Sequence, residues 1–157
     1  MIREAAAGAA IHKMVHAGRA RSFTAEIVHL LPRETNPEAF RFMAYMLDDA
    51  GVEMLPLLPF FTHSHQDFRV QAVYQAGRSS PKMKAAHIAD FAKALDDPEI
   101  RVQHTALQAL GGGNDPRLLE VYERLLRQHK NDGDYYIRSN VRRRLAFPKR
   151  IENRAHR

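Results

Sequence analysis

Apolar residues recur at steps of three and four along most of the chain, which is the spacing of one face of an α-helix. Phe40, Met43, Ala44 and Leu47 show this spacing in one such segment. No stretch combines strict apolar–polar alternation with the β-branched residues that are typical of strands. The pattern therefore predicts an all-α protein.

The same periodicity predicts a series of helices joined by short turns. The regular helices are expected over residues 2–16, 24–31, 37–49, 66–76, 81–95, 98–110, 116–129 and 135–146. Residues 52–62 are richer in apolar side chains and are predicted to form a buried but irregular helix, because Pro56 and Pro59 interrupt them. Gly51 and Gly77 are expected to end the helices before them.

Four dipeptides mark where helices begin. In each, a side chain that accepts a backbone N–H precedes a proline, and the pairs are Asn36-Pro37, Ser80-Pro81, Asp97-Pro98 and Asp115-Pro116. Proline suits the first helical position because its missing N–H would have no intrahelical partner there. The last three pairs lie 17 and 18 residues apart. This spacing fits one short helix and a turn, so the chain is expected to consist of stacked helix pairs.

A short motif also returns along the chain. Its copies are Phe68-Arg69-Val70-Gln71, Ile100-Arg101-Val102-Gln103 and, more loosely, Ile137-Arg138-Ser139-Asn140. The arginines of the copies lie 32 and 37 residues apart. Periods of about 30 to 45 residues are typical of helical solenoids, in which one repeat cannot bury its apolar face alone.

The segment from Asp97 to Val102, followed by Ala106, Leu110 and a helix start at Asp115, resembles a repeat of the HEAT family. The resemblance implies a right-handed α-α superhelix of HEAT-like helix pairs, with about nine helices and a concave surface lined by second helices. It makes 97–110 and 116–129 the two helices of one unit. Residues 1–157 are expected to form one domain, with degenerate repeats in 1–63, clearer repeats in 64–147 and a basic tail in 148–157.

The repeated position holds an arginine in all three copies, namely Arg69, Arg101 and Arg138. The family resemblance implies that such an arginine ties neighbouring repeats through an acidic residue at the preceding turn. Asp97 and Asp134 stand four residues before the second and third arginines, whereas His65 stands before the first. The ladder is therefore expected to be interrupted at His65, and structural roles are favoured over ligand contact.

The composition narrows the class of protein. No cysteine is present, which excludes disulfides, thiolate catalysis and thiolate zinc sites and fits a cytoplasmic location. The longest uncharged stretch, Met54 to Gln66, is shorter than the roughly 20 apolar residues of a membrane span. No membrane association is expected.

The net charge of +6 is concentrated at the C-terminal end. Residues 1–116 carry 12 Lys/Arg and 13 Asp/Glu, whereas residues 117–157 carry 12 and 5. Arginine binds carboxylate or phosphate through its planar fork, so this asymmetry is consistent with an acidic or nucleic-acid partner, and equally with a basic, solvated C-terminal tail. The residues expected to contact the partner are Arg117, Arg124, Arg127, Lys130, Arg142, Arg143 and Arg144.

Three local patterns resemble chemical sites, and each has a simpler explanation. His12 and His16 have a zinc-binding spacing, but Lys13 stands where a metalloprotease needs its glutamate, and a third ligand is lacking. His63-Ser64-His65 is interpreted as a loop that caps the next helix. The glycine-rich turn before Asp115 lacks the lysine of a phosphate cradle. The sequence therefore predicts no catalysis, cofactor, metal or small-molecule substrate.

The predicted function is non-catalytic binding, as a cytoplasmic scaffold or adaptor that holds an acidic protein partner through its concave surface and basic C-terminal end. The alternative is nucleic-acid binding, since HEAT-like repeats also build DNA alkylation repair glycosylases. Few aromatic residues are available here for base stacking. A lyase subunit is a third alternative, because phycobilin lyases carry similar repeats, but no particular residue supports it.

Overall fold

The computed structural model describes residues 23–111, 115–130 and 134–155, with side chains up to residue 146. The predicted helix over 2–16, the pair His12 and His16, residues 112–114 of the glycine-rich turn and the side chains of the basic tail lie outside the described residues.

Every regular element of the described residues is helical, and none is a strand, which confirms the predicted all-α class. With 3-10 helices labelled η, the elements are α2 (Thr24–Leu30), η2 (Leu31–Arg33), α3 (Pro37–Asp49), η3 (Leu55–Thr62), α4 (Gln66–Ala76), α5 (Pro81–Ala86), α6 (Ile88–Leu95), α7 (Ile100–Ala109), η4 (Pro116–Leu118), α8 (Leu119–Gln128) and α9 (Tyr135–Ala155).

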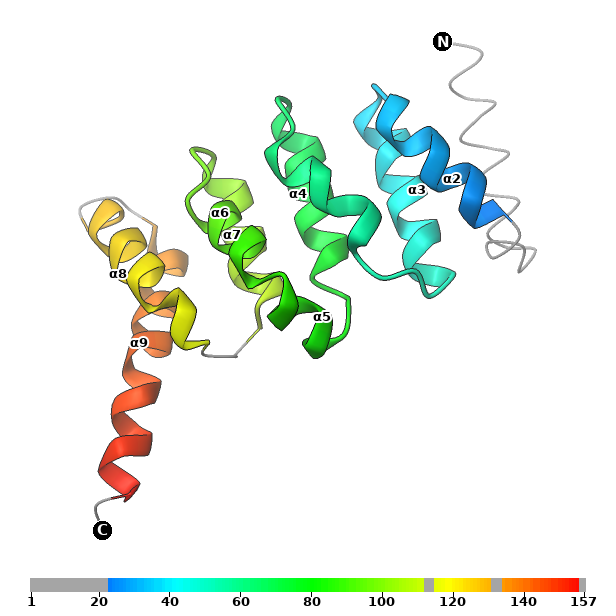
Figure 1. The fold of residues 1–157 in the computed structure, drawn as a ribbon. Helices are drawn as coiled ribbons and strands as arrows, with labels where there is room; N and C mark the ends of the chain where they lie inside the picture. The colour runs from blue at the N-terminus through cyan, green and yellow to red at the C-terminus, as the bar shows by residue number, and fades with distance from the viewer. Residues whose placement is uncertain (1–22, 112–114, 131–133, 156–157) are drawn as a thin grey trace.

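The helices form a row of hairpins in two layers (Figure 1). Each hairpin places one member in each layer: α2 pairs with α3, η3 with α4, α6 with α7, and α8 with α9. Along the row, α3 packs on α4, α4 on α7 and α7 on α9, while η3 packs on α6 and α6 on α8 in the other layer. The right-handed superhelix implied by the family resemblance stays a prediction.

The predicted pairing of 97–110 with 116–129 is wrong. The hairpin partner of α7 is α6, and that of α8 is α9. Asp115 does cap η4, since its carboxylate accepts the Arg117 N–H at 3.0 Å. A cap fixes where a helix begins but does not determine which neighbour the helix packs against. The prediction therefore paired α7 with the helix after it, whereas in the structure α7 pairs with the helix before it.

Three of the four predicted cap residues, Asn36, Ser80 and Asp115, cap a helix as predicted, whereas Asp97 does not. Asn36 Oδ1 accepts the Glu38 N–H at 2.9 Å, and Ser80 Oγ accepts the Met83 N–H at 3.2 Å. Both side chains satisfy donors that the first turn of a helix leaves without partners. Asp97 Oδ1 accepts the Glu99 N–H at 2.9 Å, but Glu99 is itself the N-cap of α7, which begins at Ile100. The helix start predicted at residue 98 is therefore two residues too early.

The helix predicted over 81–95 is divided at His87, whose φ of −109° and ψ of 27° leave the helical region. The segment before the break, α5, buries none of its residues, whereas α6 buries Ile88, Phe91 and Leu95. Apolar packing therefore orients α6 and leaves α5 free to turn away. The last helix, by contrast, continues past its predicted end at residue 146 to Ala155.

Burial shows that the repeat has a different register from the one predicted. Phe68, Val102 and Ile137 are the first buried apolar residues of α4, α7 and α9. This alignment matches Arg69 with Gln103 and with Arg138, not with Arg101. The prediction that Arg101 is the second member of the arginine series is wrong. The sequence motif aligns Phe68 with Ile100, but in the structure Phe68 corresponds to Val102, two residues later.

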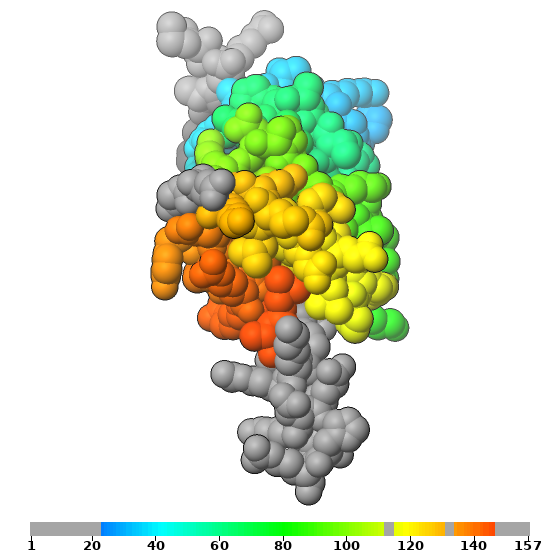
Figure 2. All heavy atoms as spheres, turned by 90° about the vertical axis from the view of Figure 1, so that its left-hand side faces the viewer, coloured from blue at the N-terminus to red at the C-terminus, as the bar shows by residue number. Residues whose placement is uncertain are grey.

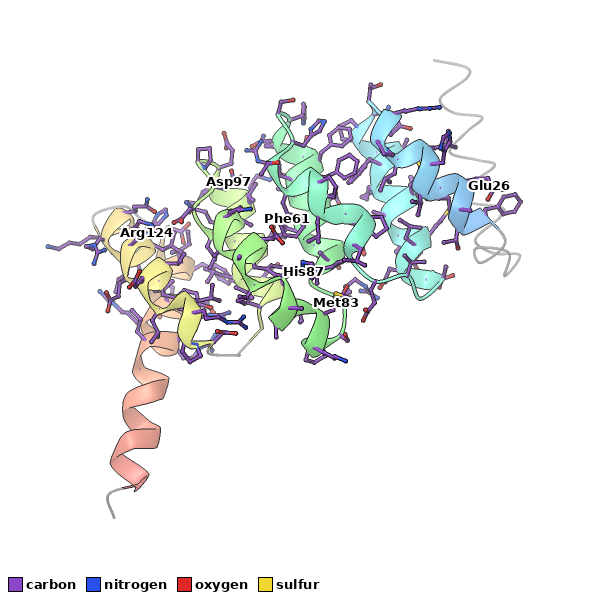
Figure 3. All side chains as sticks on the ribbon, in the orientation of Figure 1. Glu26, Phe61, Met83, His87, Asp97 and Arg124 are labelled. Carbon is purple, nitrogen blue, oxygen red and sulfur yellow. The ribbon has the colours of Figure 1, made fainter. Side chains whose placement is uncertain are left out.

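Aromatic rings join successive hairpins in the core. The Phe40 ring lies 4.6 Å from that of Phe60 and 4.8 Å from that of Phe68, measured between centroids. Farther along the row, Phe61 of η3 meets Phe91 of α6 edge-on at 5.5 Å (Figure 3). The core therefore continues from one hairpin to the next, as expected of a row in which each unit covers its neighbour.

Gly77 brings the ends of α4 and α7 close together. A Cβ atom at this position would lie 2.5 Å from the Cβ and 2.7 Å from the Cα of Ala109. The Lys84 ammonium group donates to the Gly77 and Ala109 carbonyls at 3.1 and 3.0 Å, so it caps both helices at once. Gly77 ends α4 as predicted, and the close approach explains why the residue has no side chain.

Candidate partner-binding surfaces

The structure separates the seven predicted contact residues into buried, paired and exposed groups. Arg144 is buried, with only 4% of its surface exposed. Its guanidinium donates to the Leu107 carbonyl at 2.6 Å and to the Tyr122 hydroxyl at 3.1 Å. Leu107 belongs to the last turn of α7, where carbonyls lack intrahelical partners. The prediction that Arg144 faces a partner is wrong, because this arginine caps α7 from inside the core.

Two further arginines are occupied by carboxylates of their own chain. Arg117 forms two hydrogen bonds with Asp115, at 2.9 and 2.6 Å, and donates to the Ala85 carbonyl at 2.9 Å. Hydrogen bonding from Arg117 lowers the pKa of Asp115 below its usual value. Arg124 binds both carboxylate oxygens of Asp96, and this contact raises the pKa of Arg124. Arg117 therefore joins η4 to α5, and Arg124 joins α8 to the end of α6.

Three of the predicted cations meet at one site. Arg127 and Lys130 of the α8 end and Arg142 of α9 line a groove of about 350 Å³ together with Glu123 and Leu126. We call this site the basic groove. The positions 123, 126, 127 and 130 follow the three–four spacing of one helical face. The opposite face of α8 is buried in the core.

The charge of the basic groove is largely uncompensated. Arg127 lies 4.0 Å from Glu123, at the limit of an ion pair, and its side chain is 72% exposed. Within the described part of the chain, Lys130 and Arg142 have no ion-pair partner. Arg143 is also exposed, but it does not line the groove and donates to Asn140 at 2.6 Å. Figure 2 looks onto this end of the row, where α8 (yellow) and α9 (orange) lie side by side.

The arginine ladder is present in a modified form. Arg69 binds Asp97 through two hydrogen bonds of 2.7 and 3.0 Å, and both side chains are buried. Arg69 also donates to the His63 and Ser64 carbonyls, so it ties α4 to the turn on each side. The predicted structural role is confirmed for Arg69, and the predicted interruption at this position is wrong.

The other rungs use different residues. Gln103, which matches Arg69 in the structural alignment, donates to the Asp97 carbonyl at 2.8 Å and contacts His129 at 2.8 Å. Asp134 caps α9 through the Ile137 N–H and pairs with His104, not with an arginine. Burial raises the pKa of Asp134, but these two hydrogen bonds together with the electrostatic effect of His104 and His129 outweigh it, so that the pKa is lowered overall.

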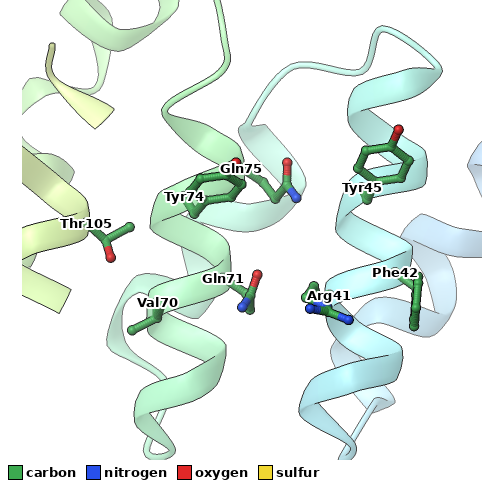
Figure 4. Close-up of a pocket in the computed structure, with 8 residues that line it drawn as sticks. All are labelled: Arg41, Phe42, Tyr45, Val70, Gln71, Tyr74, Gln75 and Thr105. Atoms are coloured by element: carbon green, nitrogen blue, oxygen red, sulfur yellow. The ribbon is translucent and has the colours of Figure 1, made fainter. Parts of the chain in front are cut away.

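A second groove, which the sequence did not predict, lies across α3 and α4. It has a volume of about 490 Å³ and is lined by Arg41, Phe42, Tyr45, Val70, Gln71, Tyr74, Gln75 and Thr105 (Figure 4). We call it the α3/α4 groove. Figure 4 shows the Gln71 and Gln75 side chains reaching from α4 toward α3.

The charged groups around the α3/α4 groove are balanced. Arg41 forms a hydrogen-bonded ion pair with Glu38 and lies over the Phe42 ring at 5.2 Å. Asp48 of α3 binds Arg78 after α4 at 2.6 Å. The groove therefore presents mainly rings and amides, whereas the basic groove presents net positive charge.

The sequence contains only a weak signal for the α3/α4 groove, namely two tyrosines. Tyr45 and Tyr74 are 44% and 49% exposed, although tyrosine is a large, mostly apolar residue. Each follows a buried residue of its helix, Ala44 or Val73, and lies off the buried face, so the periodicity marks it as exposed but does not link it to the other. The two helices meet side by side only in the folded chain.

Several histidines of the described region contribute to the fold. His65 Nδ1 accepts the Asp67 N–H at 3.2 Å, which confirms the predicted capping role of the His63-Ser64-His65 loop. No group of three or more His, Asp or Glu side chains in the described residues is placed to hold a metal ion. Among the described helices, none is long and apolar enough to cross a bilayer.

No protein-family model, curated protein or solved structure matches the chain significantly. The HEAT-repeat resemblance therefore stays a prediction that rests on the sequence motifs.

Proposed function

We propose that the protein is a non-catalytic adaptor that binds an acidic segment of a protein partner in the basic groove. The observation that supports this proposal is the convergence of Arg127, Lys130 and Arg142 around Leu126. The cations of the groove bind carboxylates by hydrogen bonding and by charge. Leu126 offers a contact for an apolar side chain between the acidic ones.

Nucleic acid is the second candidate, because the same cations also suit phosphate. Among the described side chains of α9, the ring most accessible for base stacking is that of Tyr135, which is 76% exposed. Three phosphate contacts would give a slope of about −2.7 for log K against log salt on duplex DNA. A slope near zero, or no binding at low salt, would instead mean that the groove contacts no phosphates.

The direct test uses a labelled peptide of about ten residues in which glutamate alternates with leucine, an extended length of about 33 Å. We expect Arg127→Glu/Arg142→Glu to weaken its binding by about tenfold or more, since two favourable charge contacts become repulsive. The control is Lys82→Glu/Lys93→Glu, which changes the net charge equally at exposed positions on α5 and α6. The control is expected to bind like the parent protein.

A pull-down from nuclease-treated lysate extends the test to natural partners. The proposal requires protein partners that the groove variant loses and the control variant keeps. Equal binding of the acidic peptide to both variants, or partners that disappear with nuclease treatment, would contradict it. The cytoplasmic location suggested by the lack of cysteine stays a prediction.

A further inference from the structure

The α3/α4 groove contains a buried polar group that the described protein leaves without a partner. Gln75 is 6% exposed, and its Oε1 atom accepts no hydrogen bond from the described residues. A buried acceptor without a donor costs about 1–3 kcal/mol, and native proteins leave few such groups. Oε1 itself has almost no exposed surface, but Gln75 lines the groove, so a rotation of its amide would bring this acceptor within reach of a ligand there.

The geometry points to a short, extended and uncharged peptide segment of a partner protein as the occupant of the α3/α4 groove. We propose that a main-chain N–H of this segment donates to Gln75 Oε1 while an apolar side chain lies between Tyr45 and Tyr74. The terminal torsion of a glutamine is broad, so the amide can turn its oxygen toward the groove at low cost.

The charges argue for an uncharged occupant. Arg41 is already paired with Glu38, and Asp48 with Arg78, so the groove offers no unpaired ionic group to a carboxylate or an ammonium. A main-chain amide, in contrast, brings both a donor and an acceptor without net charge. The side-chain amide of Gln71, which also lines the groove, can donate a hydrogen bond to the main-chain carbonyl of the segment.

The dimensions argue for a short extended segment. The α4 lining runs from Val70 to Gln75, which is about 7.5 Å along the helix axis. This length accommodates about two extended residues at about 3.3 Å each. Tyrosine rings suit such a contact because they provide large apolar area at little entropic cost. The floor is completed by Phe42 and Val70.

This inference does not depend on the acidic-partner proposal, because the two grooves lie on different hairpins and differ in charge. The probe is a library of synthetic peptides of about ten residues, capped at both ends, without charged side chains, and carrying Tyr, Phe, Leu or Pro at the centre. Binding is measured at about 1 M salt, where the Debye length of about 3 Å suppresses attraction to the basic groove.

Two variants test the contacts. We expect Tyr45→Ala/Tyr74→Ala to weaken binding of the best peptide by about 30-fold, the typical effect of losing an interface hot spot. Gln75→Leu is expected to weaken it by about threefold to tenfold through the lost hydrogen bond. The control Tyr135→Ala removes an exposed tyrosine outside the groove and should bind normally. Arg127→Glu/Arg142→Glu should also bind normally.

N-methylation of the peptide identifies the hydrogen bond. Methylating one particular main-chain nitrogen should weaken binding to the parent protein and leave binding to Gln75→Leu unchanged, because the variant has already lost the acceptor. Equal affinities of the parent and Gln75→Leu for every peptide would overturn the inference. Failure of all uncharged peptides to bind better to the parent than to Tyr45→Ala/Tyr74→Ala would do the same, whatever the acidic peptide does.

Discussion

Replacing Arg69 with methionine isolates the contribution of the buried tie between α4 and the turn before α7. Methionine keeps an unbranched side chain of similar length but removes the guanidinium. The substitution deletes two hydrogen bonds to Asp97, at 2.7 and 3.0 Å, and two to the carbonyls of His63 and Ser64, at 2.8 and 3.1 Å.

The expected loss of stability in Arg69→Met follows from the burial of both side chains. The Arg69 and Asp97 side chains are only 11% and 7% exposed, so the variant leaves a carboxylate inside the protein with the Glu99 N–H as its remaining described donor. Breaking a buried pair in this way costs about 3–5 kcal/mol. At about 2–4 °C per kcal/mol for a chain of this size, the melting temperature should fall by about 10 °C.

The matched control is Arg101→Met, which removes the same group from the next helix of the layer. Arg101 also pairs with an aspartate, Asp67 at 3.0 Å, but its side chain is 60% exposed. Exposed pairs contribute about 0–1 kcal/mol, so this variant should melt within a few degrees of the parent. Urea unfolding followed by circular dichroism measures both free energies of unfolding.

A double variant, Arg69→Met/Asp97→Asn, tests the cause. If the cost comes from the isolated carboxylate, the double variant should be more stable than the sum of the single effects predicts, by about 1–2 kcal/mol. A loss below about 1 kcal/mol for Arg69→Met, or strict additivity of the two changes, would refute the reasoning.

Three further outcomes are expected from thermal and pH-dependent unfolding. Gly77→Ala should destabilise by about 1–2 kcal/mol, because its Cβ would meet Ala109 at 2.5 Å and only part of that strain is offset by the stiffer unfolded chain; an increase in melting temperature would contradict the close approach. Arg144→Met should cost about 2–4 kcal/mol by leaving the Leu107 carbonyl and Tyr122 hydroxyl without their donor, whereas an exposed arginine would cost almost nothing. Because the pKa of Asp134 is lowered in the folded protein, its ionised carboxylate stabilises the fold above pH 3.8, and this stabilisation is lost as the pH falls through the folded-state pKa. Asp134→Asn should therefore make the free energy of unfolding less dependent on pH in the acid range. An unchanged acid dependence would rule this out.

The helical class and the helix starts could be predicted because both depend on local physics. Asn36, Ser80 and Asp115 accept backbone N–H groups of their own first turns, and such contacts need no knowledge of the rest of the fold. The ends of α4 were likewise predicted correctly, at Gln66 and Ala76.

Partner choice between helices could not be predicted in the same way. The pattern around Arg101 resembles that around Arg69, yet Gln103 takes the buried position, because the pairing of α7 with α6 decides which face turns inward. The burial of Arg144 could not be predicted for the same reason. The run of arginines is visible in the sequence, but only the packing of the helices shows which of them contacts the end of α7.

The basic groove was partly predictable and the α3/α4 groove was not. Arg127, Lys130 and Arg142 were selected by charge alone, and the folding of α9 against α8 brought them together. Tyr45 and Tyr74 come from helices about 30 residues apart in sequence, and only the packing of α3 on α4 makes them neighbours.

The neighbour-only packing of the hairpins has a consequence for local opening. Releasing the α8/α9 hairpin breaks one interface, whereas opening α4 or α7 disrupts interfaces on both sides together with the Arg69–Asp97 tie and the shared Lys84 cap. Amide hydrogens of α9 should therefore exchange with solvent by fraying of a single hairpin, and those at the centre of α4 only when the whole row comes apart. Slow exchange would mark the middle of the described row, and the α8/α9 hairpin would become accessible to a protease before α4 and α7 do.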